Sequence, residues 1–411
     1  MSPNLSFSID TLKNISHSFF SELKHAYEGE KSSVPFLVHE IPKPPSIKND
    51  TNIQVMVCGG TIFKTVTFQK KSDQLVQMSD EVEKNTPLFI DKNTFINFII
   101  QELKENIHYL ALNFAYPIIP ILSHDFLDGM LLHGTKEHVF AGLVGQPIGK
   151  TIQKAIFEKI HKQIFITVAN DAVCLVLSEA NEYNWDKIVG GIVGTGSNYA
   201  LTLPQNRIVN LECGNFCDFS LSESGRQVDA ESINKGQQLI EKEIAGAYLY
   251  KHFNYYVKKD KINTPLLTST RQLSENAENP QCRGSELARL ILKRSASLTA
   301  AQIAGIHAFK TYLSHKTDFN RSQLISTDST LRQAQGKPIS TDLTDSTGLT
   351  NSTDSTDLTF VMEGNLFWHG WKYKETVECT LHALGLHDVI MFTKNEHHSI
   401  KGALRLLTES I

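Results

Sequence analysis

The sequence predicts an α/β fold in which strands and helices alternate along the chain. Runs rich in β-branched and aromatic residues, such as IQVMVC and IFITVAN, alternate with runs in which apolar residues recur at helical spacing. Two apolar strands are also broken by a glycine-rich turn and resume at once, in QVMVCGGTIFKTVTFQ (54–69) and GGIVGTGSNYALTL (190–203). At 411 residues, the chain is long enough for two domains with separate cores.

The N-terminal segment predicts a helix followed by a linker. Over residues 9–27, apolar side chains recur on one helical face, at Ile9, Leu12, Ile15, Phe19, Leu23 and Ala26. The proline-rich segment 39–50 (HEIPKPPSIKND) predicts extended backbone, since each proline disfavours helix in the residue before it.

The elements that follow alternate in type. Strands are predicted at 53–60, 61–69 and 164–171, and helices at 93–107, 149–163, 172–182 and 295–309. The run 109–122 (YLALNFAYPIIPIL) predicts a buried strand that leads into a loop. The helix at 295–309 is rich in small residues, which predicts close packing against a neighbour.

One segment does not share this pattern. Residues 326–359 repeat Ser, Thr and Asp loosely and contain very few large apolar side chains. Such a segment cannot bury enough surface to offset the ordering of its backbone. It predicts a disordered surface insertion, with a functional tether as the alternative.

Composition excludes several classes of protein. With 41% hydrophobic and 20% charged residues, the chain is typical of soluble globular proteins, and a net charge of -4 gives no reason to expect nucleic acid or a membrane as partner. The longest apolar runs are too short and too interrupted by proline to span a bilayer, and the N-terminus lacks the pattern of a secretion signal, so we expect a cytoplasmic protein. Cys213 and Cys217 are the one close cysteine pair, and no second Cys or His pair completes a zinc pattern near them.

The two glycine-rich turns are suited to binding an oxyanion. Backbone N–H groups in such a turn can point outward with no side chain in the way, and Thr61 and Thr195 add hydroxyl donors. A strand follows each turn, which excludes the Rossmann fingerprint and the P-loop. One such turn is more often only a hairpin, but two copies predict related lobes whose turns face the phosphates of one nucleotide.

These motifs resemble those of the hexokinase family. The resemblance rests on VAND (168–171), VGTGSNYAL (193–201), NLECGNF (210–216) and NKGQQLIEKEIAGAYL (234–249), in that order. It implies the two-lobed actin-like ATPase fold, a duplicated ribonuclease H-like unit, closing on a sugar and ATP. On this basis we expect an N-terminal helix and linker (1–48), a small lobe (49–170), a large lobe (171–394) and a C-terminal helix (395–411).

The resemblance makes Asp171 the candidate general base for phosphorylation of a hexose. Asp171 follows the strand IFITVAN and opens a helix, where the helix dipole favours an ionised carboxylate. From the residues alone, an N-cap role is the more common explanation of such an Asp, and the two roles are compatible.

The other expected site residues are also implied by the resemblance. The expected sugar-binding residues are Thr135, Lys136, Asn170, Asn198, Glu212 and Glu241. The expected ATP-binding residues are Gly59, Gly60, Thr61, Lys64, Gly194, Thr195, Gly196, Gly364 and Ser399.

The chain departs from the family pattern in the first turn. Where hexokinases read DLGGTNFR, this sequence has Val57, Ile62 and Lys64 in place of the Asp, Asn and Arg, and Ala115 replaces a sugar-loop serine. The missing Asp normally helps to hold hydrated Mg²⁺, which valine cannot do. The resemblance nevertheless implies a hexokinase that uses ATP and Mg²⁺ on glucose, mannose or fructose. The alternatives are a hexose-binding pseudokinase or sensor, and a kinase for another sugar such as an N-acetylhexosamine.

Overall fold

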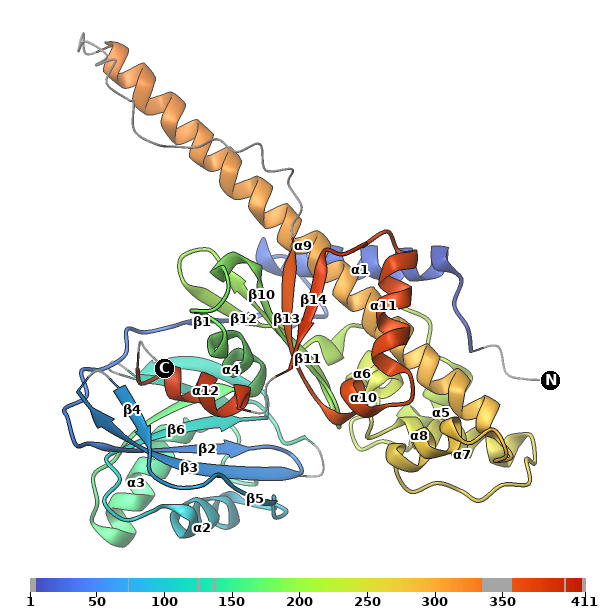
Figure 1. Cartoon of the computed structure of the whole chain (residues 1–411), viewed down its shortest axis with the longest axis horizontal. Coiled ribbons are helices and arrows are strands. Elements are labelled where there is room, and N and C mark those ends of the chain that lie inside the picture. Colours follow the sequence, from blue (N-terminus) through green and yellow to red (C-terminus); the bar gives the residue numbers. More distant parts are fainter. Residues whose placement is uncertain are drawn as a thin grey trace.

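Two mixed β-sheets with their covering helices form two lobes that lie side by side (Figure 1). The computed structural model describes residues 5–72, 74–123, 126–135, 138–334, 357–394 and 397–408. Each lobe is built on a six-stranded sheet, and a separate two-stranded hairpin flanks the smaller lobe.

The sheet of the smaller lobe has the order β4-β3-β2-β6-β9, with β5 paired to β3. Its strands are β2 (Asn52–Cys58), β3 (Ile62–Lys71), β4 (Gln74–Gln77), β5 (Val82–Asn85), β6 (Tyr109–Phe114) and β9 (Phe165–Asn170). Strands β2, β6 and β9 are parallel, and Cys58, Phe114 and Asn170 are register partners at their carboxyl ends. The first glycine turn and Asp171 therefore leave the sheet at the same edge.

Two helices and one hairpin complete this lobe. They are α2 (Lys92–Glu102), α3 (Ile148–Ile160), β7 (Ile118–Ser123) and β8 (Phe126–Leu131). The hairpin corrects the sequence prediction, because the segment expected to be a loop after β6 is strand β7, which pairs with β8. Prolines interrupt this run in the sequence, but the adjacent β8 supplies the backbone partners that make it a strand.

The sheet of the larger lobe has the order β1-β12-β11-β10-β13-β14. Its strands are β1 (Leu37–Glu40), β10 (Ile188–Val193), β11 (Ser197–Leu203), β12 (Arg207–Asn210), β13 (Leu358–Glu363) and β14 (Ile390–Thr393). Strands β10 and β11 form the second glycine hairpin, whereas β10 and β13 are parallel. The second turn and Gly364 therefore also share one sheet edge.

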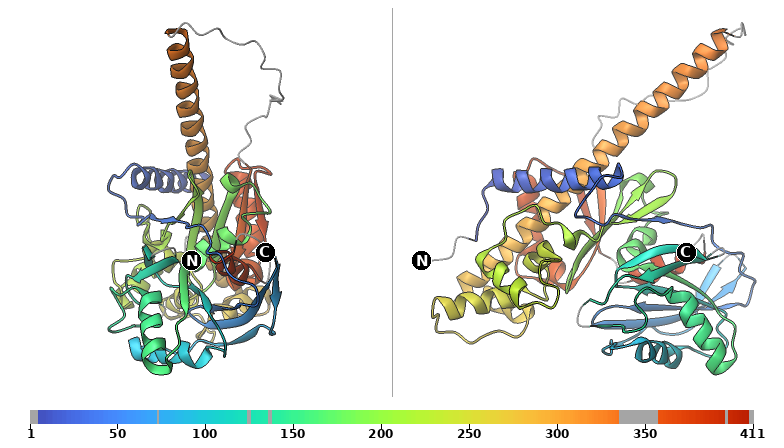
Figure 2. Two further views of the ribbon diagram at one scale, coloured as in Figure 1. Left: turned by 90° about the vertical axis from the view of Figure 1, so that its left-hand side faces the viewer. Right: turned by 180° about the vertical axis from the view of Figure 1, so that it is seen from behind.

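Helices surround this sheet. They are α1 (Ile9–Tyr27), α5 (Glu223–Glu231), α6 (Leu239–Ile244), α7 (Leu249–Lys259), α8 (Thr270–Glu278), α9 (Ser285–Ala334), α10 (Asn365–His369) and α11 (Tyr373–Ala383), with the short 3₁₀ helices η1 (Trp185–Lys187) and η2 (Cys213–Asn215). Helix α1 runs beside α9 (Figure 2), and the buried Phe19 of α1 lies against Gly305 of α9. This contact confirms the close packing predicted for residues 295–309.

Helices α4 (Asp171–Ser178) and α12 (His398–Arg405) lie together between the two sheets (Figure 1). Their backbones nearly touch, because a Cβ added at Gly402 would come within 1.8 Å of the carbonyl oxygen of Cys174. Only glycine permits this approach. The two helices thereby fix Asp171, at the start of α4, relative to Ser399, in the first turn of α12.

Two segments differ from the sequence prediction. The predicted linker 39–50 begins within β1, which pairs with β12 at the edge of the larger sheet, because the edge strand offers it backbone partners. The disordered insertion predicted over 326–359 is shorter in the structure at both ends. Helix α9 continues to Ala334, and strand β13 begins at Leu358. Residues 335–356, the greater part of that segment, lie outside the described residues.

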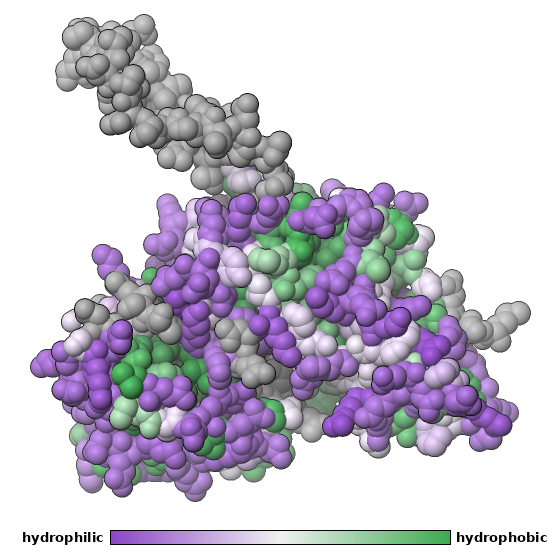
Figure 3. Space-filling view, viewed as in Figure 1, coloured by the Kyte–Doolittle hydropathy of each residue, from purple (hydrophilic) through white to green (hydrophobic). Residues whose placement is uncertain are grey.

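Hydrophilic residues cover most of the face seen in Figure 3. Within the described part of the chain, no helix has both the length and the apolar character needed to cross a membrane.

Candidate functional site

The two glycine turns line one cleft between the lobes. The cleft encloses about 1,510 Å³, including solvent at its mouth, and it borders Val57 and Lys64 of the small lobe. Each turn uses one of its own amides internally, since Gly59 donates to the carbonyl of Ile62 (3.0 Å) and Gly194 to that of Gly196 (2.9 Å). These two N–H groups therefore stabilise the turns themselves. The sequence prediction had assigned the N–H groups of the turns to anion binding without this distinction.

All nine residues predicted to bind ATP line this cleft. They are Gly59, Gly60, Thr61, Lys64, Gly194, Thr195, Gly196, Gly364 and Ser399. Two side chains also hold the backbone of the first turn. The hydroxyl of Thr86 donates to the carbonyl oxygen of Gly59 (2.9 Å), and Nε2 of His138 lies 3.1 Å from the carbonyl oxygen of Gly60.

Lys64 takes the place of the family arginine and is held by its own lobe. Its ammonium lies 2.9 Å from a carboxylate oxygen of Glu81 and 3.3 Å from one of Glu83. Burial alone would lower the pKa of Lys64, but the two carboxylates outweigh it and raise that pKa. Lys64 is therefore a fixed cation at the cleft, partly neutralised by its neighbours.

Glu363 is a cleft residue that the sequence reasoning missed. It ends β13 directly before Gly364, lines the cleft, and accepts a hydrogen bond from the hydroxyl of Ser399. Burial raises the pKa of Glu363 above its ordinary value, and the charge of Asp171 raises it further. An acidic residue at a strand end beside a glycine turn was the available signal.

A second, smaller pocket opens beside the cleft. It encloses about 420 Å³ with solvent included. The predicted sugar-binding residues that line it are Thr135, Asn170, Asn198, Glu212 and Glu241, together with Asp171. Lys136 lies outside the described residues.

Asp171 lines both the cleft and the smaller pocket. It is the first residue of α4, and its Oδ1 accepts the backbone N–H of Ala172 at 2.9 Å. The N-cap itself is Asn170, whose side-chain oxygen accepts the same N–H at 3.0 Å. The alternative explanation, in which Asp171 is the helix N-cap, is therefore wrong, because the N-cap is the preceding residue, Asn170.

Gln238 is a second pocket residue that was missed. It precedes Glu241 by three residues and has a left-handed backbone, with φ of 49°. A non-glycine residue in this conformation is uncommon and needs support from its surroundings, so propensity alone gave no reason to select it.

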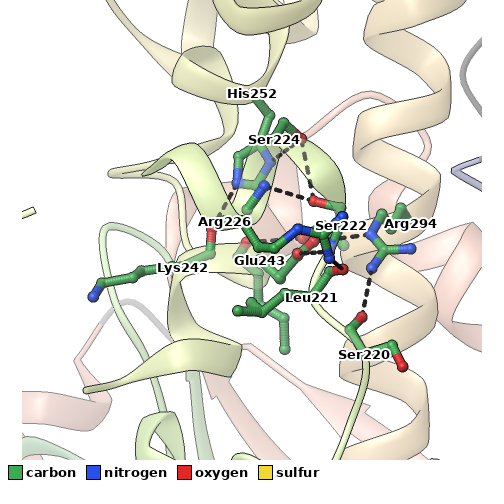
Figure 4. A network of polar contacts seen from close by, with 12 residues as sticks. Ser220, Leu221, Ser222, Ser224, Arg226, Lys242, Glu243, His252 and Arg294 are labelled. Atoms are coloured by element: carbon green, nitrogen blue, oxygen red, sulfur yellow. Dashed lines mark hydrogen bonds and ion pairs between the residues drawn. The ribbon is translucent and has the colours of Figure 1, made fainter. Parts of the chain in front are cut away.

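Behind the pocket, a buried polar network holds helix α6, which carries Glu241 (Figure 4). The carboxylate of Glu243 accepts the backbone N–H of Ser222 (2.6 Å) and the Nε–H of Arg294 on α9 (2.9 Å). The ring of His252 bridges the hydroxyl of Ser224 and the carbonyl of Lys242, at 2.8 Å each. Helix α6 is thus anchored to three neighbouring segments.

Gly214 lies directly against the carboxylate of Glu241. A Cβ at this position would come within 2.6 Å of Oε2 and 3.1 Å of the Cβ of Glu241. We predict that Gly214→Ala displaces Glu241 and weakens hexose binding about tenfold, the loss expected for one disturbed hydrogen bond to a charged group. Titration of hexose binding would test this, with the thermal unfolding midpoint as the control for folding. Unchanged affinity would mean that Glu241 does not contribute from this position.

Part of the chain is similar in sequence to known hexokinases. A family model described as hexokinase matches residues 188–257, which carry the second turn, Asn198, Glu212 and Glu241. Hexokinase-9 of Oryza sativa subsp. japonica is 25% identical over 276 residues, covering 59% of this chain and 54% of the relative. Hexokinase-2, chloroplastic, of Nicotiana tabacum is 32% identical over 145 residues, covering 32% of this chain and 29% of the relative. For the first relatives, the chain spans about half of their length.

Solved structures match over nearly the whole chain. The hexokinase from Schistosoma mansoni complexed with glucose superposes with a TM-score of 0.69 at 18% identity, covering 99% of this chain and 96% of that one. A second hexokinase crystal structure gives a TM-score of 0.64 at 19% identity, covering 98% and 96%. These matches confirm the predicted two-lobed actin-like α/β fold.

Proposed function

We propose that this chain is a hexokinase, which transfers the γ-phosphoryl group of ATP to the 6-hydroxyl of a hexose; the match of residues 188–257 to the hexokinase family model and the similarity to plant hexokinases support this. The observation that carries this proposal is the position of Asp171, which lines both the nucleotide cleft and the smaller pocket. One carboxylate can therefore face a sugar hydroxyl and the phosphate it attacks. Glucose is the expected substrate, with mannose and fructose as near relatives.

The proposed reaction assigns one proton acceptor. As the hydroxyl oxygen bonds to the γ-phosphorus, the bond to the β,γ-bridging oxygen breaks, ADP leaves with that electron pair, and Asp171 takes the hydroxyl proton. Asn198, Glu212 and Glu241 would orient the sugar, and the two glycine turns with Lys64 would hold the phosphates. Since these groups come from both lobes, bound sugar would favour closure and exclusion of water.

Magnesium would be held differently from the family pattern. Val57 is an apolar residue at the cleft, and no group of three or more His, Cys, Asp or Glu side chains among the described residues is placed to hold a metal ion. Mg²⁺ in kinase sites needs only one or two carboxylates, with phosphates and water completing its shell. Glu363 lines the cleft and fits that requirement as a direct ligand, whereas Asp171, the proposed base, would contact the ion through a bound water. The bound ion would neutralise charge on the phosphates.

The second candidate function is a hexose sensor without phosphotransfer. Val57 favours it, because the carboxylate expected before the first glycine pair is absent. A coupled assay with a panel of hexoses, ATP and Mg²⁺ distinguishes the two. Turnover supports the kinase, whereas hexose-dependent protection against heat without turnover supports the sensor.

Restoring the missing carboxylate probes the metal requirement. We predict that Val57→Asp lowers the Mg²⁺ concentration for half-maximal activity about tenfold, equivalent to ~1.4 kcal/mol of added metal binding. Val57→Asn is the matched control, because it adds a polar side chain without the charge. Identical Mg²⁺ titrations for the wild type and Val57→Asp would show that the ion does not contact this position.

A further inference from the structure

Asn210 connects two residues of the smaller pocket without lining it. It is the last residue of β12, and its side chain is completely buried. Its Nδ2 donates to Oε1 of Glu212 at 2.8 Å, and its Oδ1 accepts from Nδ2 of Asn198 at 2.7 Å. The buried amide therefore joins the two pocket residues, which also contact each other directly through the longer bond from Nδ2 of Asn198 to Oε1 of Glu212 (3.4 Å).

The orientation of this amide is determined by the surrounding hydrogen bonds. Oδ1 of Asn198 accepts the backbone N–H of Tyr199 (2.8 Å) and that of Cys213 (3.4 Å). Nδ2 of Asn198 therefore faces Asn210, which must offer its oxygen there and its NH₂ to Glu212. Asparagine supplies both the acceptor for Asn198 and the donor for Glu212. An ionised aspartate would present an acceptor on both sides, and alanine would supply neither group.

The backbone of Glu212 adds a reason why this support matters. Glu212 has a left-handed conformation, with φ of 51°, directly before η2. Such strain persists only where surrounding contacts over-determine the position, and it concentrates at functional sites. The bond from Asn210 is one of the contacts that fix its carboxylate.

We propose that Asn210 is a positioning residue, which sets the arrangement of the Glu212 carboxylate and the Asn198 amide against the hydroxyls of the bound hexose. This inference rests on the proposed function, because it takes the smaller pocket to be the sugar site. Asn210 holds Glu212 as an acceptor, so that the pocket selects ligands that direct a hydroxyl donor at this point. Its contribution is to ground-state sugar binding, through Glu212 and Asn198.

The isosteric variant Asn210→Asp tests this directly. At pH 7.5, two facing carboxylates repel, and we expect hexose affinity to fall at least tenfold. At pH 5.5, the pair can share one proton, which restores a donor toward Glu212, and most of the loss should be recovered. Burial raises the pKa of the neighbouring Cys213 thiol well above its ordinary value, so this thiol stays protonated at both pH values. The wild type also carries Glu212 and Glu241 and supplies the baseline at each pH.

Asn254→Asp is the matched control. Asn254 makes an equivalent two-sided contact outside the pocket, donating to the carbonyl of Leu267 and accepting its N–H, both at 2.8 Å. This variant should lower the unfolding temperature without a pH-dependent change in hexose affinity. If Asn210 had only a structural role, Asn210→Asp would likewise lower the unfolding temperature without a pH-dependent change in hexose affinity.

The readout is equilibrium dialysis of radiolabelled glucose against the full chain without ATP. Recovery of affinity at pH 5.5 in Asn210→Asp alone supports the inference. Wild-type affinity at both pH values, or a loss that does not depend on pH, overturns it and leaves the proposed function intact. Absence of glucose binding by the wild type overturns both. If Asn210→Asp does not fold, Asn210→Ala decides, because it should bind glucose weakly at both pH values and unchanged affinity contradicts the inference.

Discussion

Replacing Asp171 with asparagine is expected to lower the phosphotransfer rate at least about a hundredfold, or ~2.7 kcal/mol, while hexose binding stays nearly intact. Asparagine keeps the shape of the side chain and can still accept the N–H of Ala172, so α4 should retain its start. It cannot take a proton from the sugar hydroxyl. The loss should therefore fall on kcat and leave the dissociation constant for glucose almost unchanged.

The matched control for this change is Asp128→Asn. Asp128 is also a buried carboxylate; it lies on β8, and its Oδ1 accepts the N–H groups of Gly129 and of Gly149 in the first turn of α3, both at 2.7 Å. It lies outside the cleft and the pocket, so its substitution should reduce stability and leave kcat near the wild-type value. Equal activity of wild-type and Asp171→Asn proteins would remove Asp171 from the role of base.

The second large effect concerns stability, at the buried Glu243–Arg294 pair (Figure 4). Arg294→Met should destabilise the large lobe by about 3–5 kcal/mol, because the Glu243 carboxylate, with its side chain 1% exposed, would keep its charge without its partner. The change is measured as a shift in the midpoint of chemical denaturation. Since Glu243 lies on α6 with Glu241, weaker hexose binding should accompany it.

The double variant Arg294→Met with Glu243→Gln is the control. It removes the uncompensated charge but keeps an oxygen that can accept the N–H of Ser222, so much of the lost stability should return. A double variant as unstable as Arg294→Met alone would show that packing of the arginine, and not charge pairing, is the main contribution.

The pH dependence of stability supplies an independent check on this pair. Burial alone would raise the pKa of Glu243, but His252 and Arg294 oppose it and leave the pKa below its ordinary value of 4.5. A depressed carboxyl pKa gives stability that is fully present above pH 4.5 and is lost as the pH falls through the folded-state value. Arg294→Met should remove this acid-side loss of stability.

Local sequence patterns predicted the parts of the site that depend on short-range geometry. Each glycine turn joins two strands adjacent in sequence, so the hairpins at Gly59 and Gly194 followed from residue types alone. The change from strand to helix at Asp171 indicated a carboxylate at a helix start, but its assignment as the base came from the family resemblance. The sugar-binding residues depended instead on the family resemblance, since the five that line the pocket lie on five separate segments that only the fold brings together.

Other features depend on tertiary contacts that a sequence pattern does not contain. Strand β1 forms because it pairs with the edge strand β12, and strand β7 forms because it pairs with β8. Prolines in or near both strands had argued against this in the sequence. Gln238 and Glu212 adopt left-handed backbones that local propensity disfavours. Asn210 gave no signal, because a buried asparagine at a strand end is explained only by the two pocket residues it joins.

The most direct test of the account follows the phosphorus itself. The full chain is incubated with glucose, ATP and Mg²⁺, and ³¹P NMR monitors the γ-phosphate signal over time, with Asp171→Asn in parallel. We expect the wild type to produce ADP and a sugar phosphomonoester in equal amounts, and the variant to produce neither at a comparable rate. Unchanged ATP in a wild-type sample that demonstrably binds glucose would contradict the kinase and leave the sensor as the function.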